Sequence, residues 1–170
     1  MNSDHNLTPC ICDTLKGIVK TQSSWENDEH MAGKYFGSLL GGSMHFNTIP
    51  IMLMCKGSME FFISTGVFYS EEAIGCFKTP IFRVLKVIEN NVSCCIVVEL
   101  LQPQGEDRNT SSYDTHDICS FFLEKKIKRF VRSGICITVD VECFCGVECL
   151  LPVNAQRGAL VPIPNPMADP

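Results

Sequence analysis

Cysteine is the residue that most constrains this chain. Eleven of its 170 residues are cysteine, spread from Cys10 to Cys149. The first fifteen residues include Asp4 and Asp13 and contain no apolar run, so we expect no secretion signal and synthesis in the cytosol. Thiols stay reduced there, and a cysteine-dense cytosolic chain usually binds metal or carries redox chemistry. A protein that becomes oxidised only after its cell lyses is a third explanation.

Apolar runs from residue 49 onward predict β-strands. They occupy residues 49–55, 59–64, 81–88, 93–101 and 135–145. Gly, Pro and Asn residues separate the runs, as is typical of short strands joined by turns. Asn90 and Asn91 lie between the third and fourth runs and predict a hairpin there.

One helix is predicted ahead of the strands. Leu15, Ile18 and Val19 recur at helical spacing behind Asp13, which indicates a helix from Asp13 to about Trp25. The expected fold is mainly β, an antiparallel β-sandwich or barrel-like domain with a short N-terminal helix. We expect a flexible cysteine-bearing arm at 1–12, a single cysteine-rich domain at 13–152 and a proline-rich tail at 153–170.

Strand alternation divides the cysteines between the two faces of the sheet. In 135–145 the apolar face would include Cys143 and Cys145, which predicts partly buried thiols, and the polar face would carry Cys136. Cys94 and Cys95 are adjacent and cannot bridge each other without strain, so one should point inward and the other outward. Residues 10 and 12 precede the helix, on an arm that could reach a neighbouring molecule.

A metal site is the alternative to a structural role for these thiols. Cys143, Cys145 and Cys149, with Cys136 upstream, could bring thiolates to zinc or an iron–sulfur cluster. Structural zinc knuckles, however, usually have two to four residues between cysteines on a turn, whereas here a single residue separates two cysteines at a strand end. We therefore expect no metal and no cofactor.

Three other classes of function are disfavoured. The four histidines lie in polar or Gly-rich segments without a recognisable nucleophile, so we expect no enzyme. The net charge is −5, and the basic cluster at 125–132 is better explained as a solvated face than as a nucleic-acid site. No stretch approaches the roughly 20 apolar residues that span a bilayer, so we expect no membrane protein.

Four sequence blocks resemble a known family. They are Cys-Ile-Cys-Asp at 10–13, Ile-Pro-Ile-Met-Leu at 49–53, Cys-Phe-Lys-Thr-Pro-Ile-Phe-Arg-Val at 76–84 followed by Cys94-Cys95, and the segment 136–145 with 149–152. In this order they resemble the Bacillus-type spore outer-coat, crust and exosporium proteins (CotY/CotZ/ExsY-like). The Phe-Arg-Val block with its double cysteine and the Cys-Phe-Cys block are the specific ones. The resemblance extends over roughly residues 10–152.

The resemblance implies a structural protein of the endospore surface, made in the mother cell without a signal peptide. Its partners would be copies of itself, in a hexamer and an extended two-dimensional sheet, and other spore coat or exosporium proteins. We assign bonds between subunits to Cys10, Cys12 and Cys136. The candidates for bonds within the domain or in the lattice are Cys55, Cys76, Cys94, Cys95, Cys119, Cys143, Cys145 and Cys149.

Overall fold

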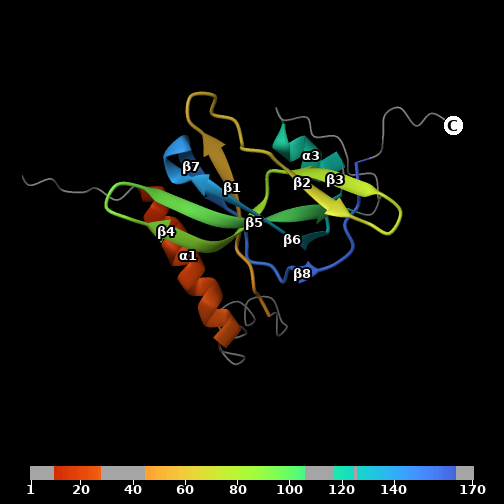
Figure 1. Ribbon diagram of the computed structural model, residues 1–170, viewed down its shortest axis with the longest axis horizontal. Coiled ribbons are helices and arrows are strands. Elements are labelled where there is room, and N and C mark those ends of the chain that lie inside the picture. The colour runs from red at the N-terminus through yellow and green to blue at the C-terminus, as the bar shows by residue number, and fades with distance from the viewer. Residues whose placement is uncertain (1–9, 28–44, 106–116, 125, 164–170) are drawn as a thin grey trace, which may run out of the picture.

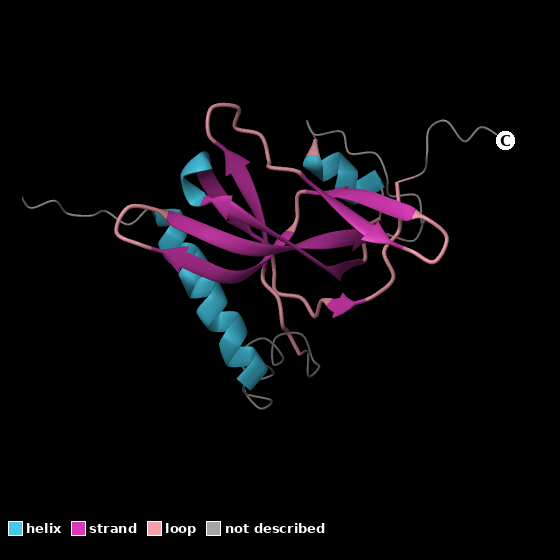
Figure 2. Cartoon of the chain, in the orientation of Figure 1, coloured by secondary structure: helices cyan, strands magenta, loops and turns pink. Residues whose placement is uncertain are grey.

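The computed structural model of the chain describes residues 10–27, 45–105, 117–124 and 126–163. Strands dominate these ranges, and one long helix lies at one side of them (Figures 1 and 2). The helical elements are α1 (Cys10–Asn27), α3 (Ile118–Glu124) and the 3-10 turn η1 (Val141–Cys143). The strands are β1 (Pro50–Cys55), β2 (Ser64–Tyr69), β3 (Ile74–Thr79), β4 (Phe82–Glu89), β5 (Cys94–Gln104), β6 (Arg129–Asp140), β7 (Phe144–Cys149) and β8 (Gln156–Arg157).

The main sheet has the strand order β7-β1-β4-β5-β6-β8. Its pairs are antiparallel, except that the two-residue strand β8 runs parallel to β6. β2 and β3 form a separate antiparallel hairpin. Among the described strands, β7 and β8 end the sheet without pairing with each other, so the sheet is open and not a closed barrel. The prediction of a mainly β domain with an N-terminal helix is confirmed.

The predicted hairpin at the two asparagines is also confirmed. Strands β4 and β5 pair from Phe82 with Leu100 to Glu89 with Cys94. The Asn90 side chain accepts hydrogen bonds from the backbone N–H groups of Val92 and Ser93, at 2.9 and 2.8 Å. Asparagine thus stabilises this turn through its short polar side chain, as it does in many tight turns.

Helix α1 begins three residues earlier than predicted. Cys12, Leu15, Ile18 and Gln22 are spaced three or four residues apart and form its buried face. Because Cys12 continues this apolar stripe, the helix includes residues 10–12. The prediction that these residues belong to a flexible arm is therefore wrong, and residues 1–9 lie outside the described ranges. Among the described residues, no helix is long and apolar enough to cross a membrane.

The two faces of the sheet are covered by different elements. On one face, α1 packs mainly on β4, and the inner side of the β2–β3 hairpin packs on β5 and β6. This larger cluster includes Leu15, Ile18, Leu53, Phe77, Phe82, Ile96, Val98 and Phe144. The smaller cluster contains Met52, Ile81 and Leu101, and its neighbours include two residues of α3, Ile118 and Phe122.

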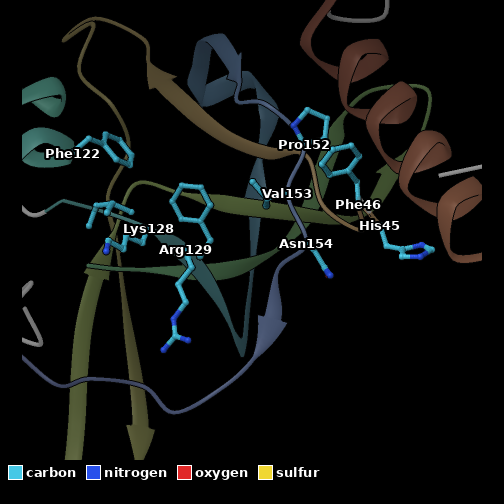
Figure 3. Close-up of a pocket in the computed structure, with 10 residues that line it drawn as sticks. His45, Phe46, Phe122, Lys128, Arg129, Pro152, Val153 and Asn154 are labelled. Carbon is cyan, nitrogen blue, oxygen red and sulfur yellow. The ribbon is translucent and has the colours of Figure 1, made fainter. Parts of the chain in front are cut away.

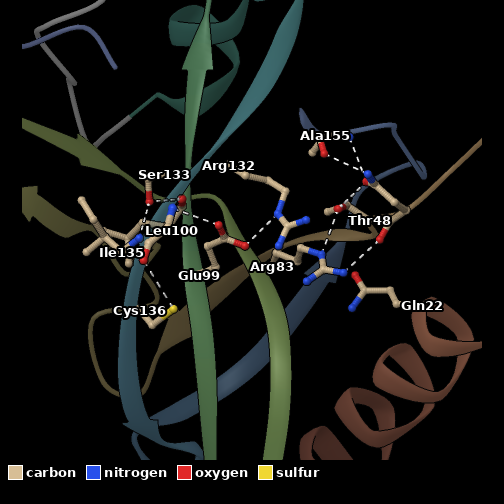
Figure 4. Close-up of polar contacts among 12 residues, drawn as sticks. Gln22, Thr48, Arg83, Glu99, Leu100, Arg132, Ser133, Ile135, Cys136 and Ala155 are labelled. Carbon is tan, nitrogen blue, oxygen red and sulfur yellow. Dashed lines mark hydrogen bonds and ion pairs between the residues drawn. The ribbon is translucent and has the colours of Figure 1, made fainter. Parts of the chain in front are cut away.

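Buried polar side chains tie α1 to the sheet (Figure 4). The amide of Gln22 donates to the Val84 carbonyl at 2.8 Å and accepts from the Ile49 N–H at 2.9 Å. Arg83 is 5% exposed and donates to the Thr48 hydroxyl at 3.1 Å and to the Glu26 carboxylate at 2.8 Å. These contacts satisfy groups that would be costly to bury unpaired.

A bulge between β5 and β6 is held by Glu99, which is 1% exposed (Figure 4). One carboxylate oxygen accepts from Arg132 Nε at 2.9 Å, and the other accepts from the Gly134 N–H at 2.9 Å. Gly134 has φ +76°, a conformation that favours glycine. After the bulge, successive side chains of β6 again point to opposite faces of the sheet. Ile135 and Ile137 pack against the larger core cluster, and Cys136 is exposed.

The predicted strand at 135–145 is interrupted, which corrects the expected exposure of two cysteines. The Asp140 carboxylate accepts from the Glu142 N–H at 2.9 Å and caps the turn η1. The turn shifts the alternation, so Phe144 is buried while Cys143 and Cys145 are exposed. The prediction that these two thiols are partly buried is therefore wrong.

Two further segments differ from the prediction. The run at 59–64 forms no strand of its own: Phe61 makes an isolated bridge with Met54, and Ser64 already begins β2 of the hairpin. The domain also extends past residue 152, because Ala155 is 1% exposed and β8 pairs with β6. Residues 153–163 are thus part of the packed structure, and 164–170 lie outside the described ranges.

We predict that replacing Gln22 with Ala destabilises the fold. The substitution leaves the Val84 carbonyl and the Ile49 N–H without their partner, which should cost about 1–3 kcal/mol. Urea unfolding followed by circular dichroism measures the change. Lys20→Ala, on the exposed side of the same helix, is the control, and an equal loss in both variants would contradict the role given to Gln22.

Candidate cross-linking thiols

All eleven cysteines lie in the described part of the chain. Two of them form a disulfide, Cys12–Cys94, and nine are free. Cys55 and Cys95 are half-buried. The exposed thiols are Cys10, Cys76, Cys119, Cys136, Cys143, Cys145 and Cys149. Most of the cysteine sulfur therefore lies where a second molecule can reach it.

The disulfide joins α1 to the start of β5. The Cα atoms of Cys12 and Cys94 are 6.4 Å apart, within the range for a disulfide, and both residues are buried. Cys12 was expected to bond between subunits, but its sulfur is bonded within the chain. The missed signal is its spacing from Leu15 and Ile18, which places it on the buried face. Cys94 points inward and Cys95 is more exposed, as predicted.

The sulfur-bearing side chains of Cys55, Cys145 and Met59 lie close together where β1 meets β7, with Cys143 nearby. Cys55 stands opposite Phe144, and the register shift beside it leaves Cys145 as an extra residue in β7. The Cys145 thiol lies 3.5 Å from the Cys55 carbonyl oxygen and 3.6 Å from the Met59 sulfur. Partial burial raises the pKa of the Cys55 thiol, and the nearby Cys145, Glu60 and Cys143 raise it further.

The four cysteines considered as metal ligands do not converge. Cys149 stands opposite Ile51 at the start of β1, whereas Cys145 lies beside Cys55 at its end. Cys136 is on β6, which β1, β4 and β5 separate from β7. The described residues contain no group of three or more His, Cys, Asp or Glu side chains that could hold a metal ion. The metal-binding alternative gains no support from this arrangement.

Two of the exposed thiols have a raised pKa. Burial raises the pKa of Cys136, as does the nearby Glu99, while Arg157 and Arg132 partly oppose the shift. Partial burial raises the pKa of Cys149, and the adjacent Glu148 adds to it. Because the thiolate is the reactive form, a raised pKa slows oxidation of these cysteines at neutral pH.

Five of the exposed thiols lie on five different elements. Cys10 begins α1 near the β4–β5 turn, and Cys76 is on the β2–β3 hairpin at the opposite end of the molecule (Figure 1). Cys119 is on α3, Cys136 on β6 and Cys149 at the end of β7. Among the described cysteines, the disulfide within the chain is Cys12–Cys94, and these five thiols are free.

A surface cavity of about 610 Å³ lies beside α3 and the start of β6 (Figure 3). Phe46, Phe122 and Phe130 line it, together with His45. No cysteine of the described chain is among its lining residues. The cavity therefore does not pair a thiol with a histidine, which is the combination that activates a cysteine nucleophile.

The fold and the thiols define a small, cysteine-rich β domain with one internal disulfide and many sulfurs at the surface. Residues 1–152 match the family described as Spore coat protein Z. The chain is also 32% identical over 149 residues to Spore coat protein Z of Bacillus subtilis (strain 168), an alignment that covers 87% of this chain and 93% of that protein. No solved structure matches the chain. The chain belongs to the Spore coat protein Z family, which confirms the resemblance found in its sequence.

We predict that the internal disulfide stabilises the domain. Replacing Cys12 and Cys94 together with Ser should lower the free energy of unfolding by about 2–4 kcal/mol under oxidising conditions. Urea unfolding with and without reductant measures this. In reductant the wild-type protein should approach the variant, and a variant as stable as the oxidised wild type would contradict the prediction.

We also predict that Glu148→Gln lowers the pKa of Cys149. Removing the carboxylate makes the thiolate less unfavourable, so the pH midpoint for alkylation of Cys149 should fall. Iodoacetamide labelling across pH, read by peptide mass spectrometry, gives the midpoint. Glu60→Gln is the matched control, because Glu60 raises the pKa of Cys55 and should leave the Cys149 midpoint unchanged.

Proposed function

We propose that this protein is a non-enzymatic structural subunit of the spore surface, joined to its neighbours by disulfides. The observation that carries the proposal is the division of its sulfurs: one buried disulfide inside the chain and seven exposed thiols spread over six elements. Membership of the Spore coat protein Z family supports a place in the spore coat.

The number and spread of the thiols favour an extended assembly. One reactive thiol can join two copies, and two thiols can join copies into a chain, but a sheet requires links in at least three directions. Cys10, Cys76 and Cys136 lie on different elements and satisfy that requirement. Head-to-tail contacts whose rotation closes make a ring, and a second kind of contact extends rings across a plane. A hexamer that tiles into a two-dimensional lattice is the arrangement we propose.

The order of events follows from redox chemistry. In the reducing mother cell the domain folds and its noncovalent contacts set the geometry of the layer. When the mother cell lyses, oxidation converts neighbouring thiols into disulfides. The layer is then held covalently, so a subunit can leave only after reduction. We place this layer at the outer coat, crust or exosporium, where other coat proteins would be further partners.

The structure changes the set of cysteines proposed to link subunits. Cys12 is removed, since its sulfur is buried in the internal bond. Cys10 and Cys136 remain, because both are exposed. Cys76, Cys119, Cys143, Cys145 and Cys149 join them for the same reason.

We predict that oxidation of the purified full chain yields species linked by disulfides and large enough to stay at the top of a denaturing gel. Dissolved oxygen or oxidised glutathione should produce them, and reductant should return them to monomers. Replacing the seven exposed cysteines with Ser should abolish the links while preserving the internal disulfide, because the Cys12–Cys94 pair is buried. Electron microscopy should show ordered sheets for the wild type.

Cys12→Ser with Cys94→Ser is the matched control, since it removes two cysteines but none of the exposed ones. It should still form large linked species. A wild-type protein that stays monomeric in oxidant with its exposed thiols reduced would contradict the proposal. So would persistent cross-linking in the variant that lacks all seven exposed thiols.

A further inference from the structure

The β2–β3 hairpin has an unusual outer face. Its inner face packs on the sheet through residues such as Phe77, which is 3% exposed. Its outer face carries Val67 opposite Cys76 and Tyr69 opposite Ile74. Val67 is 55% exposed, Tyr69 84% and Ile74 66%, and Cys76 is exposed beside them. The hairpin lies at one end of the molecule (Figure 1), so an apolar surface with a thiol in it is exposed there.

This pattern is typical of a hairpin that is covered on both sides. An antiparallel pair with one solvated face normally alternates apolar and polar residues. The outer face has three cross-strand pairs, and only the pair at the base, Thr65 with Lys78, is polar. The free edge of β3 is already engaged at this level, because the Ile163 N–H donates to the Cys76 carbonyl at 2.8 Å. A partner would therefore approach the face of the hairpin and not the edge of β3 at Cys76.

We propose that this outer face docks against the same face of a second copy of the chain, across a two-fold axis close to Cys76. This inference rests on the proposed function and names one of its contacts. In such a self-complementary contact, a residue at the axis meets its own copy. Two Cys76 thiols would thus meet between two packed hairpins, a placement in which disulfides can join sheets, as in immunoglobulin domains.

The charges of the hairpin select one orientation for this contact. Lys78 is exposed at the base of the outer face, and Glu71 and Glu72 are exposed in the turn at its tip. When the two hairpins lie antiparallel, each Lys78 points toward the acidic turn of the other copy. When they lie parallel, like charges meet, which is unfavourable. The hairpin is therefore electrostatically complementary to itself in the antiparallel orientation.

The size of the contact explains why a covalent bond would matter. A few side chains per copy bury far less than the roughly 800 Å² per partner of a stable interface. The noncovalent contact would be weak and reversible until the disulfide forms. In that step the two Cys76 thiols become one disulfide, and dioxygen takes their two electrons and two protons and becomes hydrogen peroxide. The bond converts a transient encounter into a permanent one.

The test uses the purified full chain under dissolved oxygen, with free thiols blocked at intervals by iodoacetamide. Peptide mass spectrometry measures the fraction of Cys76 bonded to Cys76 of another copy. Tyr69→Ser with Ile74→Ser should lower the initial rate of this bond about tenfold, because two exposed apolar anchors are lost. Leu151→Ser is the matched control, since Leu151 is an exposed apolar residue elsewhere, at 81%. It should leave the rate unchanged.

Charge reversal tests the orientation. Lys78→Glu should slow the Cys76 bond, and adding Glu71→Lys and Glu72→Lys to that variant should restore it, because the complementary signs are exchanged. The Cys12–Cys94 peptide in each digest reports that the variant has folded. A charge-reversed triple variant that stays as slow as Lys78→Glu would contradict the antiparallel contact.

The outcomes also separate this inference from the proposed function. If the wild type forms disulfides between copies through other cysteines but not between two Cys76 residues, the hairpin contact is wrong and the proposed function stands. An unchanged rate in the Tyr69 and Ile74 variant also overturns the contact alone. If oxidation yields no disulfide between copies at any cysteine, both fail.

Discussion

The docking of α1 on the sheet is the interaction on which the rest of the structure depends. Three contacts of different kinds are spread along the helix: the Cys12–Cys94 disulfide near its start, the Gln22 amide toward its end, and the Glu26 carboxylate on the buried Arg83 in the last turn. Between them, Leu15 and Ile18 fill the larger core cluster. The helix would gain little stability on its own in water, because most helical stability in proteins comes from packing of the apolar face against the rest of the fold. Helix α1 covers β4 and the start of β5, and the β2–β3 hairpin covers β5 and β6, so the two together bury the apolar face of the sheet.

The pleat of the strands explains how so many sulfurs reach the surface. Successive side chains of a strand point to opposite faces, so a cysteine next to a core residue is directed outward. Cys76 precedes the buried Phe77, and Cys145 follows the buried Phe144. Cys95 follows the inward Cys94 in the same way, and only the inward member of that pair is bonded within the chain. The core residues thus determine which thiols are available to another molecule.

Much of this arrangement follows from local patterns, and the remainder depends on contacts that are distant in sequence. The helix and the β4–β5 hairpin were predictable because each has a strong local signal, the helical spacing of Leu15 and Ile18 and the turn at Asn90. The division of Cys94 and Cys95 follows from their adjacency alone. In contrast, the alternation through Cys143 and Cys145 failed because one carboxylate, that of Asp140, caps a turn inside an otherwise continuous apolar run. The bond of Cys12 depends on where the helix lies across β5, some eighty residues later in the chain. The packing of residues 153–163 likewise requires β6 as a partner for β8.

The thiol environments bear on the order of assembly for a layer of the proposed kind. Partial burial raises the pKa of Cys55, Cys136 and Cys149, so at neutral pH these residues hold less thiolate and oxidise more slowly. At these three positions, slow oxidation allows noncovalent contacts to form and to correct themselves before bonds make them permanent. A chain with fast, indiscriminate thiols would instead be trapped in disordered links, because each wrong disulfide must be attacked by another thiolate before it can rearrange. The net charge of −5 adds a further constraint, since like-charged subunits repel over a distance of about 8 Å at physiological ionic strength. A contact that places an apolar face and opposite charges together is therefore favoured over random collision, and the disulfide then removes the possibility of dissociation.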